Sequence, residues 1–201
     1  MLKKVKQIIV VTSILLSGCT VITPNKSQYL IDPVVKTSKA EKSSCKDKSI
    51  KIAQAFSATA LMSRKMKYTY DEQQEFTYSE SAWSRAPSRA ITAVLLESVR
   101  ASGLFKNVNN YKSRSRSNLI LETNIEEFVQ HYEDNNTKSF VKAIISFSLV
   151  DAKTSTTIDN KTIEVQLNTE TLNAQGGAKA LNDALAEILQ KNNEWLGSLC
   201  R

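Results

Sequence analysis

The stretch that decides the fold is Phe140-Val141-Lys142-Ala143-Ile144-Ile145-Ser146-Phe147-Ser148-Leu149-Val150, in which apolar side chains recur at every second position. Such alternation places these side chains on one face, which is typical of a strand with one buried face. The segments on either side, 118–133 and 162–168, alternate in the same way, with an irregularity at Glu126-Glu127, and polar turns join them to this strand. Three consecutive strands with short connections predict an antiparallel meander.

Two amphipathic helices are predicted outside the meander. Pro87 suits the first turn of a helix because its missing amide hydrogen costs nothing there, and Gly103 suits the position after the last turn. After Gly176-Gly177, apolar residues recur at helical spacing as far as Leu199. The polar face of this helix is not rich in Lys or Arg, so packing against the sheet is favoured over lying on a membrane. The sequence therefore predicts an α+β fold, with an antiparallel meander sheet and two amphipathic helices packed on one face.

The segment before the first helix is expected to add shorter strands. Residues 49–58 alternate imperfectly and fit a strand in either phase, whereas residues 65–70 alternate clearly. Aromatic residues repeat that spacing after a polar run, which predicts a hairpin. The aromatic residues of one hairpin face are Tyr68, Tyr70, Phe76 and Tyr78. Such a row can stack a ligand, but aromatic residues at strand spacing more often form one face of a core, and we expect a core here.

The N-terminal segment ends in Leu16-Ser17-Gly18-Cys19 and has the layout of a secretory signal, with three early lysines and a short apolar run. That run is too short for the roughly 20 residues that a membrane-spanning helix needs. The tetrapeptide resembles the lipobox of bacterial lipoproteins, in which cleavage leaves the cysteine as the new N-terminus, carrying lipid. We therefore expect acyl chains such as palmitate on Cys19, which would anchor the mature protein to a membrane.

Processing at this site would divide the chain into a signal peptide (1–18), a lipidated, polar tether with a short strand near 28–32 (19–48), and one α+β domain (49–201). The formal net charge is +7 for the whole chain and falls to about +4 when the three signal-peptide lysines are removed. Outside the cytoplasm, nucleic acid is not an expected partner for this charge. Anionic phospholipid or lipopolysaccharide headgroups are the natural candidates.

Cys45 and Cys200 are left as a pair if Cys19 carries lipid. An even number of cysteines in an oxidising compartment suggests a disulfide, which here would close nearly the whole mature chain. Two unrelated thiols are the alternative, because a sequence does not show whether two Cα atoms come within bridging range.

The densest basic feature of the mature sequence comprises Lys112, Arg114 and Arg116. In an extended chain their alternation would place all three side chains on one side, where they would suit lipid phosphates or a partner protein. The alternative is a solvated loop or a charged sheet edge that discourages strand pairing.

Sequence patterns for catalysis or metal binding are weak. His131 is the only histidine, it lies in a strand pattern, and neither Cys45 nor Cys200 has metal-ligand spacing to it. A Ser-His-Asp triad assembled in space stays open in principle, but no G-x-S-x-G motif supports it. Glu126 and Glu127 are adjacent, so in a strand they point to opposite faces and cannot act as a pair. We expect no enzymatic activity, no catalytic residues, no metal and no cofactor.

Several motifs resemble the ABC-type transport auxiliary lipoproteins, the family that includes PqiC and accompanies MCE-type lipid transport systems. In chain order they are the lipobox ending at Cys19, Gln28-Tyr29-Leu30-Ile31-Asp32-Pro33, the segment from Tyr78 through Trp83 to Pro87, and Ser102-Gly103-Leu104-Phe105-Lys106-Asn107-Val108. The second half of the chain matches the family in its pattern of elements and not in motif. The polar stretch 36–48, which contains Cys45, is not a feature that we associate with the family.

The resemblance implies a periplasmic α+β domain that helps an ABC transporter and an MCE-type protein to move lipids or other hydrophobic compounds, by binding and bridging and not by catalysis. From their position at a strand-to-helix junction, we single out Tyr78 and Trp83 as partner-contact or packing residues. Thr20 stands where an Asp would retain a lipoprotein at the inner membrane of enterobacteria, so we expect the periplasmic face of the outer membrane, with the inner membrane as the alternative. Two other functions stay open: an outer-membrane structural or assembly lipoprotein, and a lipid-binding carrier.

Overall fold

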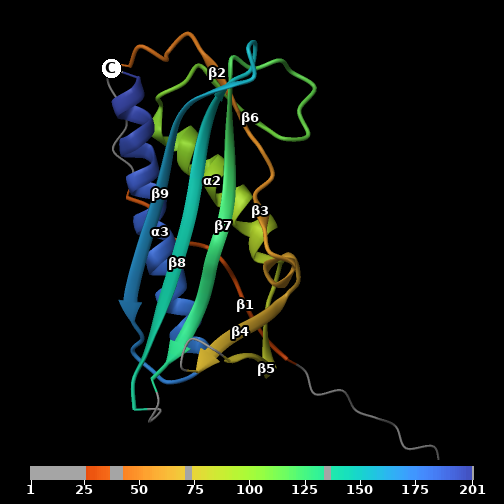
Figure 1. Cartoon of the computed structure of the whole chain (residues 1–201), viewed down its shortest axis with the longest axis vertical. Helices are drawn as coiled ribbons and strands as arrows, with labels where there is room; N and C mark the ends of the chain where they lie inside the picture. The colour runs from red at the N-terminus through yellow and green to blue at the C-terminus, as the bar shows by residue number, and fades with distance from the viewer. Residues whose placement is uncertain (1–25, 37–42, 71–73, 134–136, 201) are drawn as a thin grey trace, which may run out of the picture.

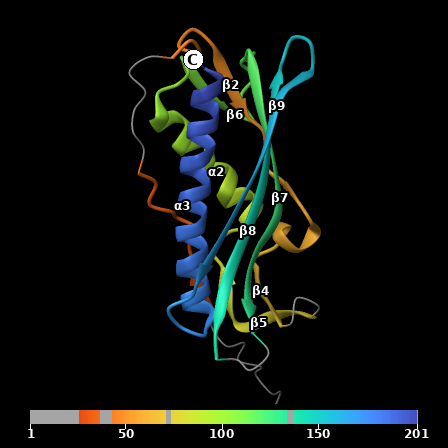
Figure 2. The same ribbon diagram turned by 60° about the vertical axis from the view of Figure 1, so that its left-hand side comes forward.

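The computed structural model describes residues 26–36, 43–70, 74–133 and 137–200. The long strand β7 (Leu119–Tyr132) lies inside a nine-stranded mixed sheet, and the helices α2 (Pro87–Ser102) and α3 (Ala174–Leu199) cover one face of that sheet (Figure 1, Figure 2). The signal peptide and Cys19 lie outside the described residues. Within the described part of the chain, no helix has the length and apolar character of a membrane span.

One half of the sheet is the predicted antiparallel meander. β7 pairs with β8 (Ser139–Asp151), which pairs with β9 (Thr156–Asn168). Every second residue of β8 is buried from Val141 to Leu149, in the predicted phase. The irregularity predicted near Glu126 is a β-bulge, which shifts the β7–β8 register between Ile125 and Glu127.

The other half of the sheet corrects the prediction of a purely antiparallel meander. β2 (Ser49–Ile52), β3 (Phe56–Ser57) and β4 (Lys65–Tyr70) pair in parallel with the same edge of β7, one after another along its length. A short 3-10 helix, η1 (Thr59–Met62), separates β3 from β4. The prediction was wrong here because alternation identifies a strand but does not show which distant strand it pairs with.

Three further strands extend this half. β5 (Gln74–Trp83) pairs antiparallel with β4, which confirms the predicted hairpin. β1 (Ser27–Tyr29) pairs in parallel with β5, slightly earlier in the chain than the strand predicted near 28–32. β6 (Asn107–Asn110) pairs in parallel with β2, and α2 lies between β5 and β6 in the chain, so it carries the chain across from one end of the sheet to the other.

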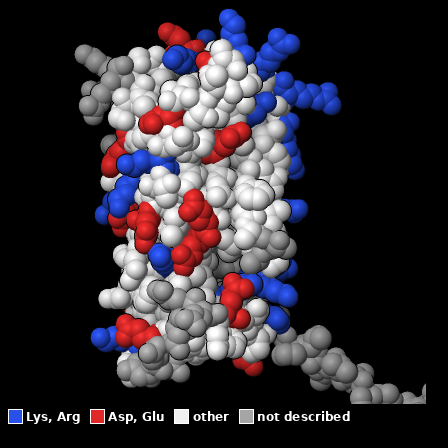
Figure 3. All heavy atoms as spheres, viewed as in Figure 1, with Lys and Arg blue, Asp and Glu red and all other residues white. Residues whose placement is uncertain are grey.

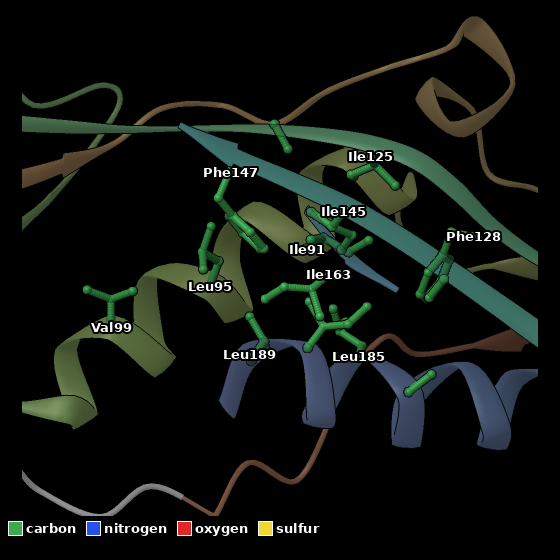
Figure 4. Packing of buried hydrophobic residues seen from close by; sticks show 14 of the residues in the cluster. Ile91, Leu95, Val99, Ile125, Phe128, Ile145, Phe147, Ile163, Leu185 and Leu189 are labelled. Atoms are coloured by element: carbon green, nitrogen blue, oxygen red, sulfur yellow. The ribbon is translucent and has the colours of Figure 1, made fainter. Parts of the chain in front are cut away.

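The two helices enclose one hydrophobic core against the sheet, as Figure 4 shows from close by. Gly103 ends α2 in the left-handed conformation, with φ 66°, and its N–H donates to the carbonyl of Arg100. α3 begins earlier than predicted, because the Asn173 side chain caps it by accepting a hydrogen bond from the Gly176 N–H at 2.9 Å. The residues labelled in this core are Ile91, Leu95, Val99, Ile125, Phe128, Ile145, Phe147, Ile163, Leu185 and Leu189.

Candidate functional site

A hollow lined by basic side chains lies where β7 begins and where the turn between β8 and β9 meets β2. We call it the basic hollow and define it by Lys48, Lys51, Arg116 and Lys153. Its volume is about 650 Å³, and Asp151 is the one acidic residue in its lining. Figure 3 shows Lys and Arg side chains projecting from this end of the molecule, uppermost in that view. Four cations around one carboxylate make the hollow suitable for an anionic group.

Asn118 holds the strands at the floor of the basic hollow. Its side-chain oxygen accepts hydrogen bonds from the Ser49 N–H at 2.8 Å and the Ser49 hydroxyl at 3.0 Å, and these bonds tie β2 to the start of β7. Its backbone carbonyl accepts from the Ala152 N–H at 2.9 Å, which adds the β8–β9 turn. Three segments distant in sequence are therefore fixed at one point.

Asp151 does not neutralise the hollow by taking up a proton. The backbone N–H groups of Thr154 and Lys153 donate to its carboxylate at 3.0 and 2.8 Å and hold its pKa below the ordinary value. Lys51 is directed toward the neighbouring loop, because its ammonium donates to the Ser113 carbonyl at 3.1 Å. Asp151 is therefore a carboxylate at neutral pH.

Of the three cations predicted as one basic patch, the structure places only Arg116 in the hollow. Residues 111–118 form an irregular loop and not an extended strand, so the alternation in sequence does not align the three side chains. Lys112 lies with its ammonium 5.6 Å from the centroid of the Tyr111 ring, and Arg114 is exposed. The sequence analysis did not identify Lys48, Lys51 and Lys153 as site residues. These lysines lie in separate turns and strands, and no local sequence pattern shows that such segments meet in the fold.

The opposite end of the sheet carries what we call the aromatic cluster: Tyr68, Tyr70, Phe76, Tyr78 and Tyr132. Tyr68 is central, with ring centroids 4.5 Å from Tyr78, 5.5 Å from Phe76 and 5.6 Å from Tyr132. Tyr78 packs against the main core, whereas Tyr68 and Tyr70 are half-buried outside it and Phe76 is 40% exposed. The prediction that this face belongs to the core is therefore correct for only part of it.

Hydrogen bonds fix the inner side of the aromatic cluster. The Tyr78 hydroxyl donates to Gln130 Oε1 at 2.9 Å and lies 2.7 Å from the Tyr132 hydroxyl. Gln130 is fully buried and donates in turn to the Ser139 hydroxyl at 3.0 Å. Burial, the hydrogen bond to Tyr132 and the neighbouring phenols raise the pKa of Tyr78 far above its ordinary value. Tyr78 is a neutral, rigidly held residue that positions the exposed rings.

Trp83 was predicted to be either a partner-contact or a packing residue, and the structure places it in the packed core. Its side chain is only 2% exposed, and its ring centroid lies 5.9 Å from that of Phe128. A buried indole at this junction stabilises the core and presents no contact surface to a partner.

His131 belongs to β7 and lies on the other face of the sheet, beside Thr69 of β4. Its Nδ1 is 2.7 Å from the Thr69 hydroxyl, its Nε2 is 2.6 Å from Glu127 Oε1, and its ring stacks on Phe140 at 4.9 Å. This is the connectivity of a hydroxyl, imidazole and carboxylate triad. β4 is paired on both sides, by β5 and β7, so the ladders occupy the backbone donors around Thr69 that an oxyanion hole would need. We therefore interpret this arrangement as a set of side-chain hydrogen bonds that links β4 to β7, and we call it the cross-strand tie.

Glu127 contacts both His131 and Lys142. Burial favours a higher pKa for Glu127, but the hydrogen bond and charge of His131 and the ammonium of Lys142, 3.6 Å away, lower the pKa below its ordinary value. Glu127 is therefore a carboxylate over most of the pH range.

Cys45 and Cys200 are joined in a disulfide, with their Cα atoms 5.3 Å apart. It fastens the turn before β2 to the end of α3, where the Ser44 N–H also donates to the Cys200 carbonyl at 2.8 Å. Both cysteines are buried. Across the residues that the structure describes, no group of three His, Cys, Asp or Glu side chains could hold a metal ion.

Comparison with known proteins identifies the fold. Neither a family model nor a curated protein matches the sequence. A solved structure from Xanthomonas campestris, assigned to the DUF330 family, superposes with a TM-score of 0.76 at 14% identity, covering 86% of this chain and 95% of that one. This chain shares the fold of that structure. A second solved structure, of an uncharacterized protein, matches with a TM-score of 0.66 at 13% identity, over 86% of this chain and 99% of that one.

Among the more distant matches to this chain is the PelC dodecamer of Paraburkholderia phytofirmans, with a TM-score of 0.46 at 12% identity over 77% of this chain and 94% of that one. The stronger matches support the α+β class and the two-helix layer. On this fold, the chain places a basic hollow and an aromatic cluster at opposite ends of one long sheet.

Proposed function

We propose that this chain is a lipid-anchored periplasmic auxiliary lipoprotein of an ABC/MCE-type transport system, which acts by binding and bridging and not by catalysis. The observation that carries this proposal is the position of the basic hollow relative to the start of the domain. The first described strand, β1, lies beside β5, and the hollow lies at the other end of β7 from the β4–β5 hairpin. A domain that is anchored at one end and charged at the other is suited to bridge a membrane and a partner.

The basic hollow is the surface that we assign to the partner. Its net charge and the fixed strands around Asn118 suit an anionic surface of an MCE-type protein. The transport context itself rests on the motifs that resemble the auxiliary lipoproteins. We place the protein at the periplasmic face of the outer membrane, because Thr20 follows the predicted lipidated Cys19.

The test compares two double charge reversals in the lipidated chain. Arg116→Glu with Lys153→Glu changes the hollow, and Arg85→Glu with Arg89→Glu makes the same change of charge on exposed residues near the start of α2. The hollow variant should lose co-purification with an MCE-type partner protein and should stay in the membrane fraction. The α2 variant should keep both properties. Full co-purification of the hollow variant would refute the assignment of the hollow.

The same preparations also test the two alternative functions, an assembly lipoprotein and a lipid-binding carrier. Co-purification with an outer-membrane assembly factor in place of transporter components would indicate an assembly lipoprotein. Lipid extracted in a constant ratio from the purified mature chain would indicate a carrier. The core between the helices and the sheet is filled by packed side chains, which favours bridging over carriage (Figure 4).

A further inference from the structure

The chain enters the domain in the direction of the aromatic cluster. β1 is parallel to β5, with Ser27 beside Ser81 and Tyr29 beside Trp83. Because the strands are parallel, the direction from Tyr29 back to Ser27 is also the direction from Trp83 back to Phe76 along β5. A tether that continues this direction toward the N-terminus leads to the end of the sheet that carries the exposed aromatic rings.

The part of the tether that precedes β1 limits how far the lipid anchor can lie from that end of the sheet. Only residues 20–26 separate Cys19 from Ser27, so even a fully extended chain spans at most about 28 Å. From Ser81, beside Ser27, to Phe76 the distance along β5 is about 17 Å. The basic hollow lies roughly 30 Å from Ser27 in the opposite direction, counted along and across the strands, which exceeds the full reach of the tether.

The aromatic cluster has the chemistry of a membrane-interface contact. Phe76 exposes 40% of its surface, and neither the Tyr68 nor the Tyr70 hydroxyl has a hydrogen-bond partner among the described residues. Tyr and Trp rings favour the headgroup region, where one side of the ring is apolar and the other is wet. The charged pair of this hairpin, Lys67 with Glu75, lies on the other face. Among the described residues of the hairpin, the aromatic face therefore carries no ion pair.

We propose that the aromatic cluster rests in the headgroup region of the bilayer that holds the lipid anchor. In this orientation the β4–β5 hairpin contacts the bilayer, and the basic hollow at the other end of the sheet faces away from that bilayer, toward the periplasm. This inference rests on the lipid anchor of the proposed function. It adds a second contact, made by protein side chains, that orients the domain on the membrane.

The experiment places a tryptophan reporter at each end of the lipidated chain, reconstituted in phosphatidylethanolamine and phosphatidylglycerol vesicles that contain lipids with brominated acyl chains. Phe76→Trp reports on the aromatic cluster. Ile158→Trp is the matched control, since Ile158 is 49% exposed and lies beside the basic hollow. The native Trp83 and Trp195 are 2% and 9% exposed, and their signal is subtracted with the parent chain.

We expect the emission of Phe76→Trp to shift to shorter wavelength and to be quenched by the brominated lipids, while Ile158→Trp emits as in water. Quenching of Ile158→Trp alone would overturn the inference, because the hollow would then face the bilayer. Quenching of neither reporter in protein that floats with the vesicles would also overturn it and leave the cluster to a second copy or a partner protein. Chains that do not float would refute the anchor, and with it both the proposed function and this orientation.

Discussion

Replacing Gly177 by alanine in the first turn of α3 should destabilise the protein, although alanine is the better helix former. A Cβ atom at position 177 would lie 1.9 Å from Oε1 and 2.7 Å from Cδ of Gln130. Gln130 is fully buried, and its amide is held by Tyr78 on one side and Ser139 on the other. The amide therefore cannot turn away without losing hydrogen bonds that tie β5, β7 and β8 together.

The magnitude follows from three opposing contributions. Alanine in place of glycine inside a helix favours folding by about 1 kcal/mol. Overpacking a tight core site costs about 1–3 kcal/mol. Leaving a buried amide without its partners costs about another 1–3 kcal/mol. The free energy of unfolding should therefore fall by roughly 1–5 kcal/mol in Gly177→Ala.

The assay is urea unfolding of the mature chain, with Gly197→Ala as the matched control in the same helix. The nearest atom to a Cβ at position 197 is Leu104 Cδ2 at 3.7 Å, an ordinary contact, so this variant should gain about 0.5–1 kcal/mol. In the double variant with Gln130→Ala, the cost of Gly177→Ala should shrink, because the clash is gone. The reasoning is refuted if Gly177→Ala is as stable as Gly197→Ala.

Three other predictions use the same unfolding assay. Replacing Cys45 and Cys200 by serine should cost up to about 5 kcal/mol, since the disulfide spans 155 residues, and reductant should then have no further effect; equal sensitivity of the variant and the parent to reductant would contradict this. Trp83→Ala should cost about 3–5 kcal/mol at its contact with Phe128, and a folded variant that lacks only partner binding would restore a contact role. The pKa of Glu127 is lowered in the folded protein, so its carboxylate contributes stability that is present above the ordinary pKa of 4.5 and is lost as the pH falls below it. Glu127→Gln should therefore make the free energy of unfolding fall less steeply with acidification below that pH; an unchanged slope would count against the hydrogen bond to His131.

The parts of the fold that the sequence predicted are those encoded by local pattern. Alternation in 118–133 and 140–150 identified β7 and β8, and the Pro87 and Gly103 signals bounded α2. The parallel pairing of β2, β3 and β4 with one edge of β7 was not predictable, because each is short and its partner lies far along the chain. Pairing over such separations is set by tertiary packing and not by strand propensity.

The candidate site was predicted less well than the fold, for the same reason. Lys112, Arg114 and Arg116 looked like one patch because they alternate, yet alternation aligns side chains only in an extended chain, and this segment is a loop. The hollow draws Lys48, Lys51 and Lys153 from three other segments, whose meeting depends on the β2–β7 and β8–β9 pairings. Among its basic residues, only Arg116 was within reach of sequence reasoning.

A single bulge in β7 explains how one strand serves both ends of the molecule. Up to Ile125 the odd-numbered residues face the helices, and after the extra residue at Glu126 the even-numbered residues Phe128 and Gln130 do so. Without that shift, His131 would turn toward α3 and Gln130 would turn toward solvent, because a slip of one residue exchanges the two faces of a strand. Gln130 could then no longer hold Tyr78, and the aromatic cluster would lose its inner support. The irregularity visible in the sequence as two adjacent glutamates therefore has a structural role: it lets the core continue to the end of the sheet that carries the aromatic rings.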